Sequence, residues 1–451
     1  MIRGISLDGK KESTIITWTL KRLRNPVRVR IPLRQGGRDK AVACVKHDDT
    51  VKAGQIIARP ADSFSTPLHA SVSGKVITVG SFPHPLLDFC DAVEIIGDGK
   101  NETMPGIGSE RHGWEALGRE SLTELFRDSG LTSMDAAMLP LHVLMEDAAP
   151  RKIHTLVINA CEPEPYVTSE HALMMSHPLE ILKGAEILRK ALGADKLVIA
   201  LLEDKLQVAE LFKSKIYFLK WNHVDVRVLP QVYPQGLDVP LVETLFGLKI
   251  KLPSEFQKGM YVQDQALALA KTFHGYGVHL QTAAAVYAIY EAVVLQKPFY
   301  ERPVTVGGEC VMEPKNLWLP MGLSLQDSFK GGRGLMREPG RVVMGGPMQG
   351  HEQETLETPI VKGTSAVLAL PREVTEAPSA VACVHCGLCV EVCPSEISPV
   401  MITLAAENGL YEESAAWGAE DCLRCGNCTY VCPSKRPMAS LIREAQKHLP
   451  E

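Results

Sequence analysis

The chain has 451 residues, of which 45% are hydrophobic and 22% charged, a composition typical of globular proteins with buried cores. At roughly 100–200 residues per domain, this length predicts three or four domains. The formal net charge of -5 argues against a nucleic-acid-binding protein, which needs a surplus of Lys and Arg. No apolar run reaches the roughly 18 residues that span a bilayer, and the first residues lack the apolar core of a signal peptide. We therefore expect a cytoplasmic protein.

The N-terminal part of the chain has the pattern of an all-β domain, which we expect over residues 1–110. Residues 27–31 alternate apolar and polar side chains with the period of two that a strand requires. Gly, Asp and Pro residues mark turns in the stretch that follows. Residues 51–57 and 67–76 resemble the biotinyl/lipoyl-type barrel sandwich. The lysine that carrier domains modify has no counterpart here, so we do not expect a swinging arm.

Residues 111–255 alternate helix and strand patterns. We expect helices at 121–129 and 178–192, a buried strand at 155–159, and strands at 196–201 and 224–229. Continuous apolar strands between helices indicate a parallel sheet, which binds its ligands just beyond the C-terminal ends of the strands. Glu162 and Glu164 follow the first strand and are therefore candidate binding residues.

Residues 256–370 are expected to form helices at 263–270 and 282–296, followed by a β-rich unit at 302–348 with glycines at its turns. A segment rich in Pro and Glu, residues 371–378, reads as the linker into a last domain, residues 371–451.

The last domain contains eight of the twelve cysteines, in two copies of the pattern C-x2-C-x2-C-x3-C-P. Crowded cysteines in a cytoplasmic protein indicate a metal site rather than disulfides. Three thiolates from one loop can bind three corners of a cubane cluster, and in two-cluster ferredoxins the fourth Cys of each run binds the other cluster. This pattern predicts two [4Fe–4S] clusters, one on Cys383, Cys386, Cys389 and Cys432, the other on Cys422, Cys425, Cys428 and Cys393.

The alternative for these cysteines is structural zinc, which also takes four thiolates. Zinc sites usually have paired C-x2-C turns with a longer gap, whereas here four cysteines fall within eleven residues and a Pro follows. Gly387 and Gly426, after the second Cys of each motif, allow backbone N–H groups to approach the sulfurs. Iron–sulfur chemistry is favoured, and two adjacent clusters pass one electron at a time.

Several short motifs accompany the cysteines in a particular order. A Gly-Ile leader at residues 4–5 precedes the barrel-sandwich segment, an acidic loop follows at 159–166, Tyr-Pro-Gln-Gly at 233–236, and Gly-Gly-Pro-Met at 345–348. In this order the whole chain resembles the RnfC family, a component of the Rnf electron-transport complex, which is a membrane-bound, ion-translocating oxidoreductase that links ferredoxin and NAD. The resemblance implies a multidomain α+β and α/β protein: a barrel-sandwich β domain, an α/β domain like the flavin subunit of complex I, a β-grasp (SLBB-like) unit and a two-cluster ferredoxin domain.

The resemblance also implies a function within an enzyme complex. The chain would be a peripheral electron-transfer subunit on the cytoplasmic face of the cell membrane. Its partners would be other Rnf-type membrane subunits and ferredoxin or a similar carrier.

One departure from the family concerns the flavin. Members that oxidise NADH carry a G-x-G-G-A-G-F-P loop, which brings backbone amides against the flavin phosphate. Residues 133–140 instead read Ser-Met-Asp-Ala-Ala-Met-Leu-Pro, with the carboxylate of Asp135 where a dianion would bind. Flavin mononucleotide (FMN) is therefore disfavoured. Glu162 and Glu164 are either a vestigial nucleotide site or loop acids that cap the next helix.

Three other functions compete with this one: an NADH-oxidising flavoprotein subunit, a stand-alone flavin and iron–sulfur reductase of the corrinoid type, and a non-catalytic scaffold. A basic segment raises a further choice, between docking an acidic partner or membrane surface and the solvated face of an edge strand. Its members are Lys21, Arg22, Arg24, Arg28, Arg30, Arg34, Arg38 and Lys40.

Overall fold

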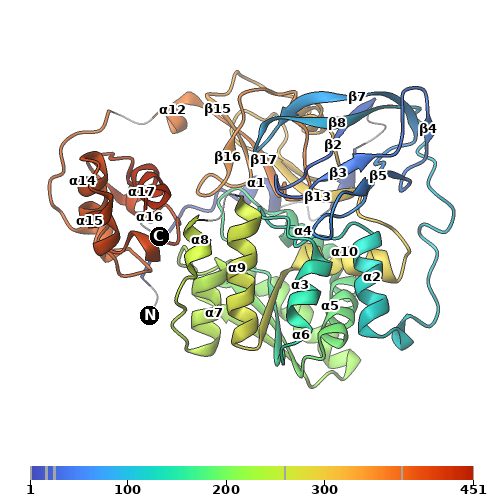
Figure 1. Cartoon of the computed structure of the whole chain (residues 1–451), viewed down its shortest axis with the longest axis horizontal. Helices are drawn as coiled ribbons and strands as arrows, with labels where there is room; N and C mark the ends of the chain where they lie inside the picture. Colours follow the sequence, from blue (N-terminus) through green and yellow to red (C-terminus); the bar gives the residue numbers. More distant parts are fainter. Residues whose placement is uncertain (1–2, 16–18, 24–26, 259–260, 377–378, 450–451) are drawn as a thin grey trace.

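The computed structural model describes residues 3–15, 19–23, 27–258, 261–376 and 379–449. Figure 1 shows a large body that combines β-sheets and helices, with the C-terminal helices gathered in a small separate unit at its side. The multidomain α+β and α/β fold expected from the sequence is confirmed. Within the described residues, no helix is both long and apolar enough to cross a membrane.

Two small antiparallel sheets enclose one core in the N-terminal unit. In β2, Val29 and Ile31 are buried in this core while Arg28 is exposed, as the alternation predicts. One sheet has the order β2-β8-β7-β4, with β2 (Arg28–Pro32), β8 (Asp88–Gly97), β7 (Gly74–His84) and β4 (Thr50–Val51). The other has the order β3-β5-β6, with β3 (Ala41–Ala43), β5 (Ile56–Pro60) and β6 (Leu68–His69).

The α/β unit contains a parallel four-stranded sheet in the order β11-β10-β9-β12. Neighbouring residues of strand β9 lie on opposite faces of the sheet. Ile158 belongs to the core formed with one set of helices, and Val157 to the core formed with a second set. The strands are β9 (Thr155–Asn159), β10 (Lys196–Leu202), β11 (Val224–Leu229) and β12 (Val278–Thr282). The first helix set is α2 (Arg119–Asp128), α3 (Leu141–Ala148), α5 (Pro178–Leu192), α6 (Leu206–Leu219) and α10 (Ala283–Val293). The second is α7 (Asp238–Phe246), α8 (Ser254–Lys258) and α9 (Val262–Gly275).

Strand β12 was not expected from the sequence. His279 and Gln281 interrupt its apolar pattern, yet both are buried, and His279 bonds to Gln281 and to His274. The strand pairs with β9, so the parallel sheet includes residues beyond position 255. Thr282 ends the strand and caps α10 by accepting a hydrogen bond from the Ala285 N–H at 3.1 Å.

A six-stranded mixed sheet with the order β1-β14-β13-β17-β15-β16 forms the β-grasp unit. Its central strand is β17 (Ala366–Leu370), which is wholly buried and lies outside the β-rich stretch expected at 302–348. Helix α11 (Leu325–Gly331) packs on β13 and β14. The other strands are β1 (Lys21–Arg22), β13 (Glu301–Gly307), β14 (Lys315–Pro320), β15 (Arg341–Met344) and β16 (His351–Glu352).

The C-terminal unit is a small helical bundle built around the two cysteine motifs. Helices α14 and α17 pack against each other through Ile402 and Ile442, both fully buried. Helix α12 (Arg372–Thr375) occupies the first part of the expected linker, whose residues 377–378 lie outside the described residues. The helices are α13 (Leu388–Glu391), α14 (Pro399–Glu407), α15 (Tyr411–Ala416), α16 (Asn427–Val431) and α17 (Met438–Lys447).

Candidate iron–sulfur site and the neighbouring cavity

The eight cysteines of the C-terminal unit line two separate cavities. The first cavity, of about 100 Å³, is lined by four cysteines that we call the outer set: Cys383, Cys386, Cys389 and Cys432. The second, of about 20 Å³, is lined by four that we call the inner set: Cys393, Cys422, Cys425 and Cys428. Each set takes three cysteines from one motif and the last cysteine of the other. The sulfurs are thus grouped as the crosswise pattern predicts, and cluster ligation by these two sets stays a prediction.

The cysteine motifs hold their shape through left-handed backbone conformations. Gly387 and Gly426 have φ of 80° and 86°, conformations that a side chain would strain. Two of the N–H groups that reach sulfur come from the residues just before the second Cys: His385 donates to Cys383 Sγ and Arg424 to Cys422 Sγ, each at 3.4 Å. Such bonds stabilise thiolates and help set cluster potentials.

The thiols of the inner set are in a low-dielectric environment. Burial raises the pKa of Cys422 to about 11 and that of Cys425 to about 12. Thiolates at these positions therefore need a positive counter-charge, which iron would supply. Among the described residues, no three or more His, Cys, Asp or Glu side chains are placed to hold a single metal ion. Each cysteine set surrounds a cavity instead, and the all-sulfur donor set fits a cluster.

The two sets differ in their surroundings. Cys386 of the outer set is exposed, and Val384 beside it is 64% exposed. The inner set lies against the body of the protein: the Tyr233 hydroxyl donates to the Cys425 carbonyl at 2.8 Å, and Met348 packs in the same apolar contact. Both come from loops singled out in the sequence, 233–236 and 345–348. One set therefore faces solvent and the other faces the α/β and β-grasp units.

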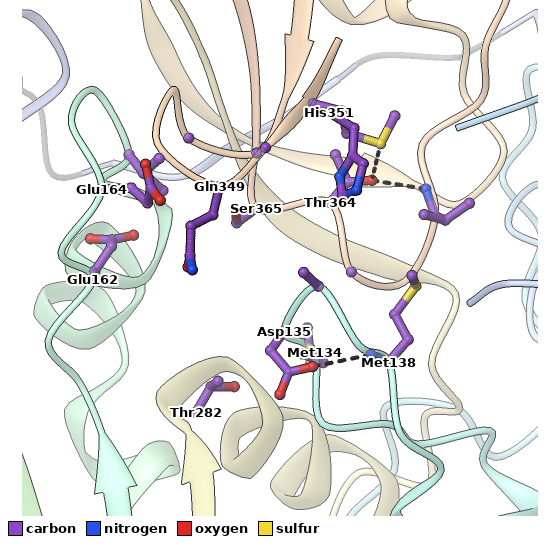
Figure 2. Close-up of a pocket in the computed structure, with 18 of the residues that line it drawn as sticks. Met134, Asp135, Met138, Glu162, Glu164, Thr282, Gln349, His351, Thr364 and Ser365 are labelled. Carbon is purple, nitrogen blue, oxygen red and sulfur yellow. Dashed lines mark hydrogen bonds between the residues drawn. The ribbon is translucent and has the colours of Figure 1, made fainter. Parts of the chain in front are cut away.

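A larger cavity, of about 210 Å³, lies beyond the C-terminal ends of the parallel strands, where it is closed by the β-grasp unit (Figure 2). Glu162 and Glu164 both line it. Met348 connects it with the inner set, because its N–H donates to Glu164 at 2.9 Å while its side chain lies beside Gly426. The position agrees with the rule for ligand sites of parallel sheets.

The carboxylates of this cavity are already engaged with backbone amides. Glu162 accepts from the N–H groups of Glu170 and His171 at 2.8 and 3.2 Å, in the first turn of α4 (Ser169–Ser176). This is the helix-capping role, one of the two roles left open by the sequence. Burial raises the pKa of Glu164 to about 7, and one of its oxygens has no hydrogen-bond partner in the described part of the chain.

In the loop at 133–140, two backbone N–H groups are bonded to the carboxylate of Asp135, which belongs to the same loop. Asp135 Oδ1 accepts from the Ser133 hydroxyl at 2.7 Å and from the N–H groups of Ala137 and Met138 at 2.9 and 3.1 Å. Figure 2 shows the bond between Asp135 and Met138. A phosphate would need these amides, and it would also meet the charge of Asp135. The residues present therefore do not fit a flavin phosphate at this loop.

A further buried acid, Glu170, was not singled out from the sequence. Glu170 accepts from the N–H of Ala283 at 3.1 Å, at the start of α10. Burial and then the nearby charge of Glu162 raise the pKa of Glu170 to about 8. An acid in the first turn of a helix is ordinary in a sequence, so no local signal reveals that Glu170 turns inward.

Four of the eight residues of the basic segment form ion pairs within the chain. Arg30 bonds to Glu94 at 2.9 Å and Glu357 at 2.7 Å, and Arg28 lies 3.6 Å from Glu94. Arg24 lies outside the described residues. Further ion pairs join Arg22 to Glu301 and Arg38 to Asp264. β2 lies at the edge of its sheet, and together with these contacts this favours the solvated face of an edge strand over partner docking.

Comparison with known proteins identifies the chain's relatives. Three family models match consecutive parts of it: the RnfC barrel sandwich hybrid domain (residues 1–100), the Nuo51 FMN-binding domain (126–270) and the 4Fe-4S dicluster domain (382–436). The C subunit of the Na(+)-translocating ferredoxin:NAD(+) oxidoreductase complex of Acetobacterium woodii is 32% identical over 447 residues, covering 99% of this chain and 96% of that protein. The chain belongs to the RnfC family.

Other members of the RnfC family match most of the chain. The C subunit of the proton-translocating ferredoxin:NAD(+) oxidoreductase complex of Clostridium ljungdahlii is 31% identical, covering 86% of this chain and 80% of that protein. The C subunit of the ion-translocating oxidoreductase complex of Rhodobacter capsulatus is 31% identical, covering 87% and 72%. The resemblance predicted from the motif order is confirmed. Among solved structures, an NAD+-reducing [NiFe]-hydrogenase matches with a TM-score of 0.47 and 15% identity, covering 75% of this chain and 62% of that one.

Proposed function

We propose that this protein is a flavin-less electron-transfer subunit of an ion-translocating Rnf-type oxidoreductase. It acts peripherally at the cytoplasmic face of the cell membrane, where partner subunits hold it. It passes single electrons between ferredoxin, or a similar soluble carrier, and those membrane subunits. Two [4Fe–4S] clusters supply the one-electron carriers, one held by the outer set of cysteines and one by the inner set.

The observation that carries this proposal is the grouping of the eight cysteines into two neighbouring sets, one at the surface and one against the body of the protein. The relatives that match over most of the chain are subunits of ferredoxin:NAD(+) oxidoreductase complexes. A chain of two clusters between a soluble carrier and a membrane complex fits both facts.

Electrons are exchanged with a partner at the outer set, because a partner can approach Cys386 there without displacing other parts of the chain. Several apolar side chains around this set are exposed, which is the usual mark of a docking surface. They are Val381 (60%), Val384 (64%), Leu388 (40%) and Tyr430 (54%).

A flavin is left out of the proposal because Asp135 and Glu170 occupy the backbone amides that an anion would use. The second candidate function is an NADH-oxidising flavoprotein subunit. It is favoured by the match of residues 126–270 to an FMN-binding domain and by the 210 Å³ cavity next to the inner set.

Anaerobic purification followed by iron, sulfide and flavin analysis separates the two functions. We expect about eight irons and eight sulfides per chain, no flavin, and reduction of the clusters by reduced ferredoxin but not by NADH. One flavin per chain together with fast reduction by NADH would establish the second candidate. Zinc in place of iron would refute both.

A further inference from the structure

Arg424 lies inside the second cysteine motif, between two cysteines of the inner set. Its backbone has a φ of 56°, which directs its N–H to Cys422 Sγ at 3.4 Å. The position is equivalent to His385 in the first motif, whose side chain is exposed. Arg424 is instead half-buried, between the C-terminal unit and the α/β unit.

Neutral amides hold the Arg424 guanidinium. Its Nε donates to Gln446 Oε1 at 2.7 Å, its Nη1 to Gln265 Oε1 at 2.7 Å, and its Nη2 to Gln257 Oε1 at 3.2 Å. The ring of Phe256 lies 5.6 Å from the guanidinium carbon. In the part of the chain that the structure describes, no carboxylate forms an ion pair with Arg424.

A second arginine of the same unit, Arg436, is paired with a carboxylate, whereas Arg424 is not paired with any carboxylate of the described residues. Arg436 lies 2.6 Å from a carboxylate oxygen of Glu407, so its charge is balanced locally. Burying a guanidinium without a carboxylate is costly, and three glutamine amides do not cancel its charge. The charged groups that act on Arg424 are Cys422, when ionised, and Arg443, a second cation near the inner set.

We propose that the positive charge of Arg424 raises the reduction potential of the inner cluster above that of the outer cluster. Reduction adds one negative charge to a centre that four thiolates already make negative. A fixed positive charge in a low-dielectric position stabilises that reduced state. The outer set has only the exposed His385 at the matching position, where solvent screens any charge.

This inference rests on the proposed function, because it requires that both clusters are present. It also gives electron transfer a preferred direction: an electron that enters at the exposed outer set moves to the inner set, where it is more stable. The position of the Arg424 side chain also depends on how the C-terminal unit packs against the α/β unit, since Gln257 and Gln265 belong to α8 and α9 of the α/β unit. Without that contact, two of the three amides that aim Arg424 are lost.

The test is a redox titration of the full, anaerobically purified chain, followed by electron paramagnetic resonance. Arg424→Gln removes the charge, and Arg424→Lys keeps it. Lys447→Gln is the matched control, because it removes an exposed charge that pairs with Glu444 on α17. Cys386→Ser, which alters the outer cluster only, identifies which reduction step belongs to which cluster.

We expect Arg424→Gln to lower the equilibrium constant for reduction of the inner cluster at least tenfold, a shift of about 59 mV to more negative potential. The outer step should stay where it is, and Arg424→Lys should recover most of the shift. Lys447→Gln should leave both steps unchanged.

Unshifted potentials in Arg424→Gln, with iron and sulfide content intact, would overturn the inference while leaving the proposed function standing. Equal shifts in Arg424→Gln and Arg424→Lys would also overturn it, because they would indicate a geometric effect without a contribution from charge. The absence of both clusters from the unsubstituted protein would refute the proposed function itself.

Discussion

Replacing Cys432 with Ser is expected to remove the cluster of the first cysteine motif, although Cys432 belongs to the second. Cys432 lines the same cavity as Cys383, Cys386 and Cys389 and is absent from the cavity of the inner set. A cubane that loses one of its four thiolates is expected to be lost or damaged. The iron content should therefore fall from about eight to about four per chain, with the second cluster retained.

Double substitutions make this prediction sharper. Two changes on one cluster are not additive, whereas changes on different clusters add. Cys386→Ser with Cys432→Ser should keep about four irons per chain, as each single variant does. Cys425→Ser with Cys432→Ser should lose nearly all of the iron. Iron and sulfide analysis measures both, and electron paramagnetic resonance shows which signal remains.

The matched control is Cys44→Ser, which changes an exposed cysteine outside the C-terminal unit and should retain about eight irons. The opposite pattern would refute the crosswise assignment: full loss of iron in the Cys386 and Cys432 pair, with half retained in the Cys425 and Cys432 pair. That result would mean that each motif supplies all four ligands of its own cluster.

Three further predictions concern the rest of the chain. Asp135→Ala leaves two backbone amides of the 133–140 loop unpaired, so the free energy of unfolding in urea should fall by about 1–3 kcal/mol, and an unchanged value would contradict the role given to this carboxylate. Glu164 has a pKa of about 7 in the folded protein against an ordinary value of 4.5, so the folded state binds more protons and its stability falls as pH rises between these values. Glu164→Gln should reduce that loss of stability by about 1–3 kcal/mol in unfolding measurements at a series of pH values, and an unaltered slope would refute the raised pKa. Arg30→Glu breaks the contacts with Glu94 and Glu357 and should lower stability by about 1–3 kcal/mol without changing the salt dependence of cluster reduction by ferredoxin; a changed salt dependence would instead support partner docking.

The cysteine motifs were interpretable from sequence because their information is local. The spacing of Cys383, Cys386 and Cys389 places three sulfurs on one loop wherever that loop lies in the protein. The strands at 155–159 and 224–229 were predicted with the same bounds that the structure has, because largely apolar or alternating runs are typical of strands. Strand β12 was missed because His279 and Gln281 break its apolar pattern, although both side chains are buried in the folded protein.

The roles of the acids near the strand ends depended on how the backbone folds around them and, for Glu164 and Glu170, on contacts with distant segments. Glu162 became a helix cap because α4 begins where its carboxylate lies, and Asp135 occupies its own loop because the backbone folds around it. Glu170 gave no sign of its buried position in the sequence. The bonds of Glu164 and Glu170 join groups whose proximity no local pattern encodes.

The sequence by itself determined that this protein has eight thiols in two repeated motifs, a parallel α/β unit, and a 133–140 loop without the glycines of a flavin site. Only the tertiary structure decided which cysteine set faces solvent, which one lies against the body, and that Arg424 is held by amides from three different helices. The reason is physical: spacing along the chain controls local geometry, whereas exposure and electrostatic environment arise from the packing of segments that are far apart in sequence.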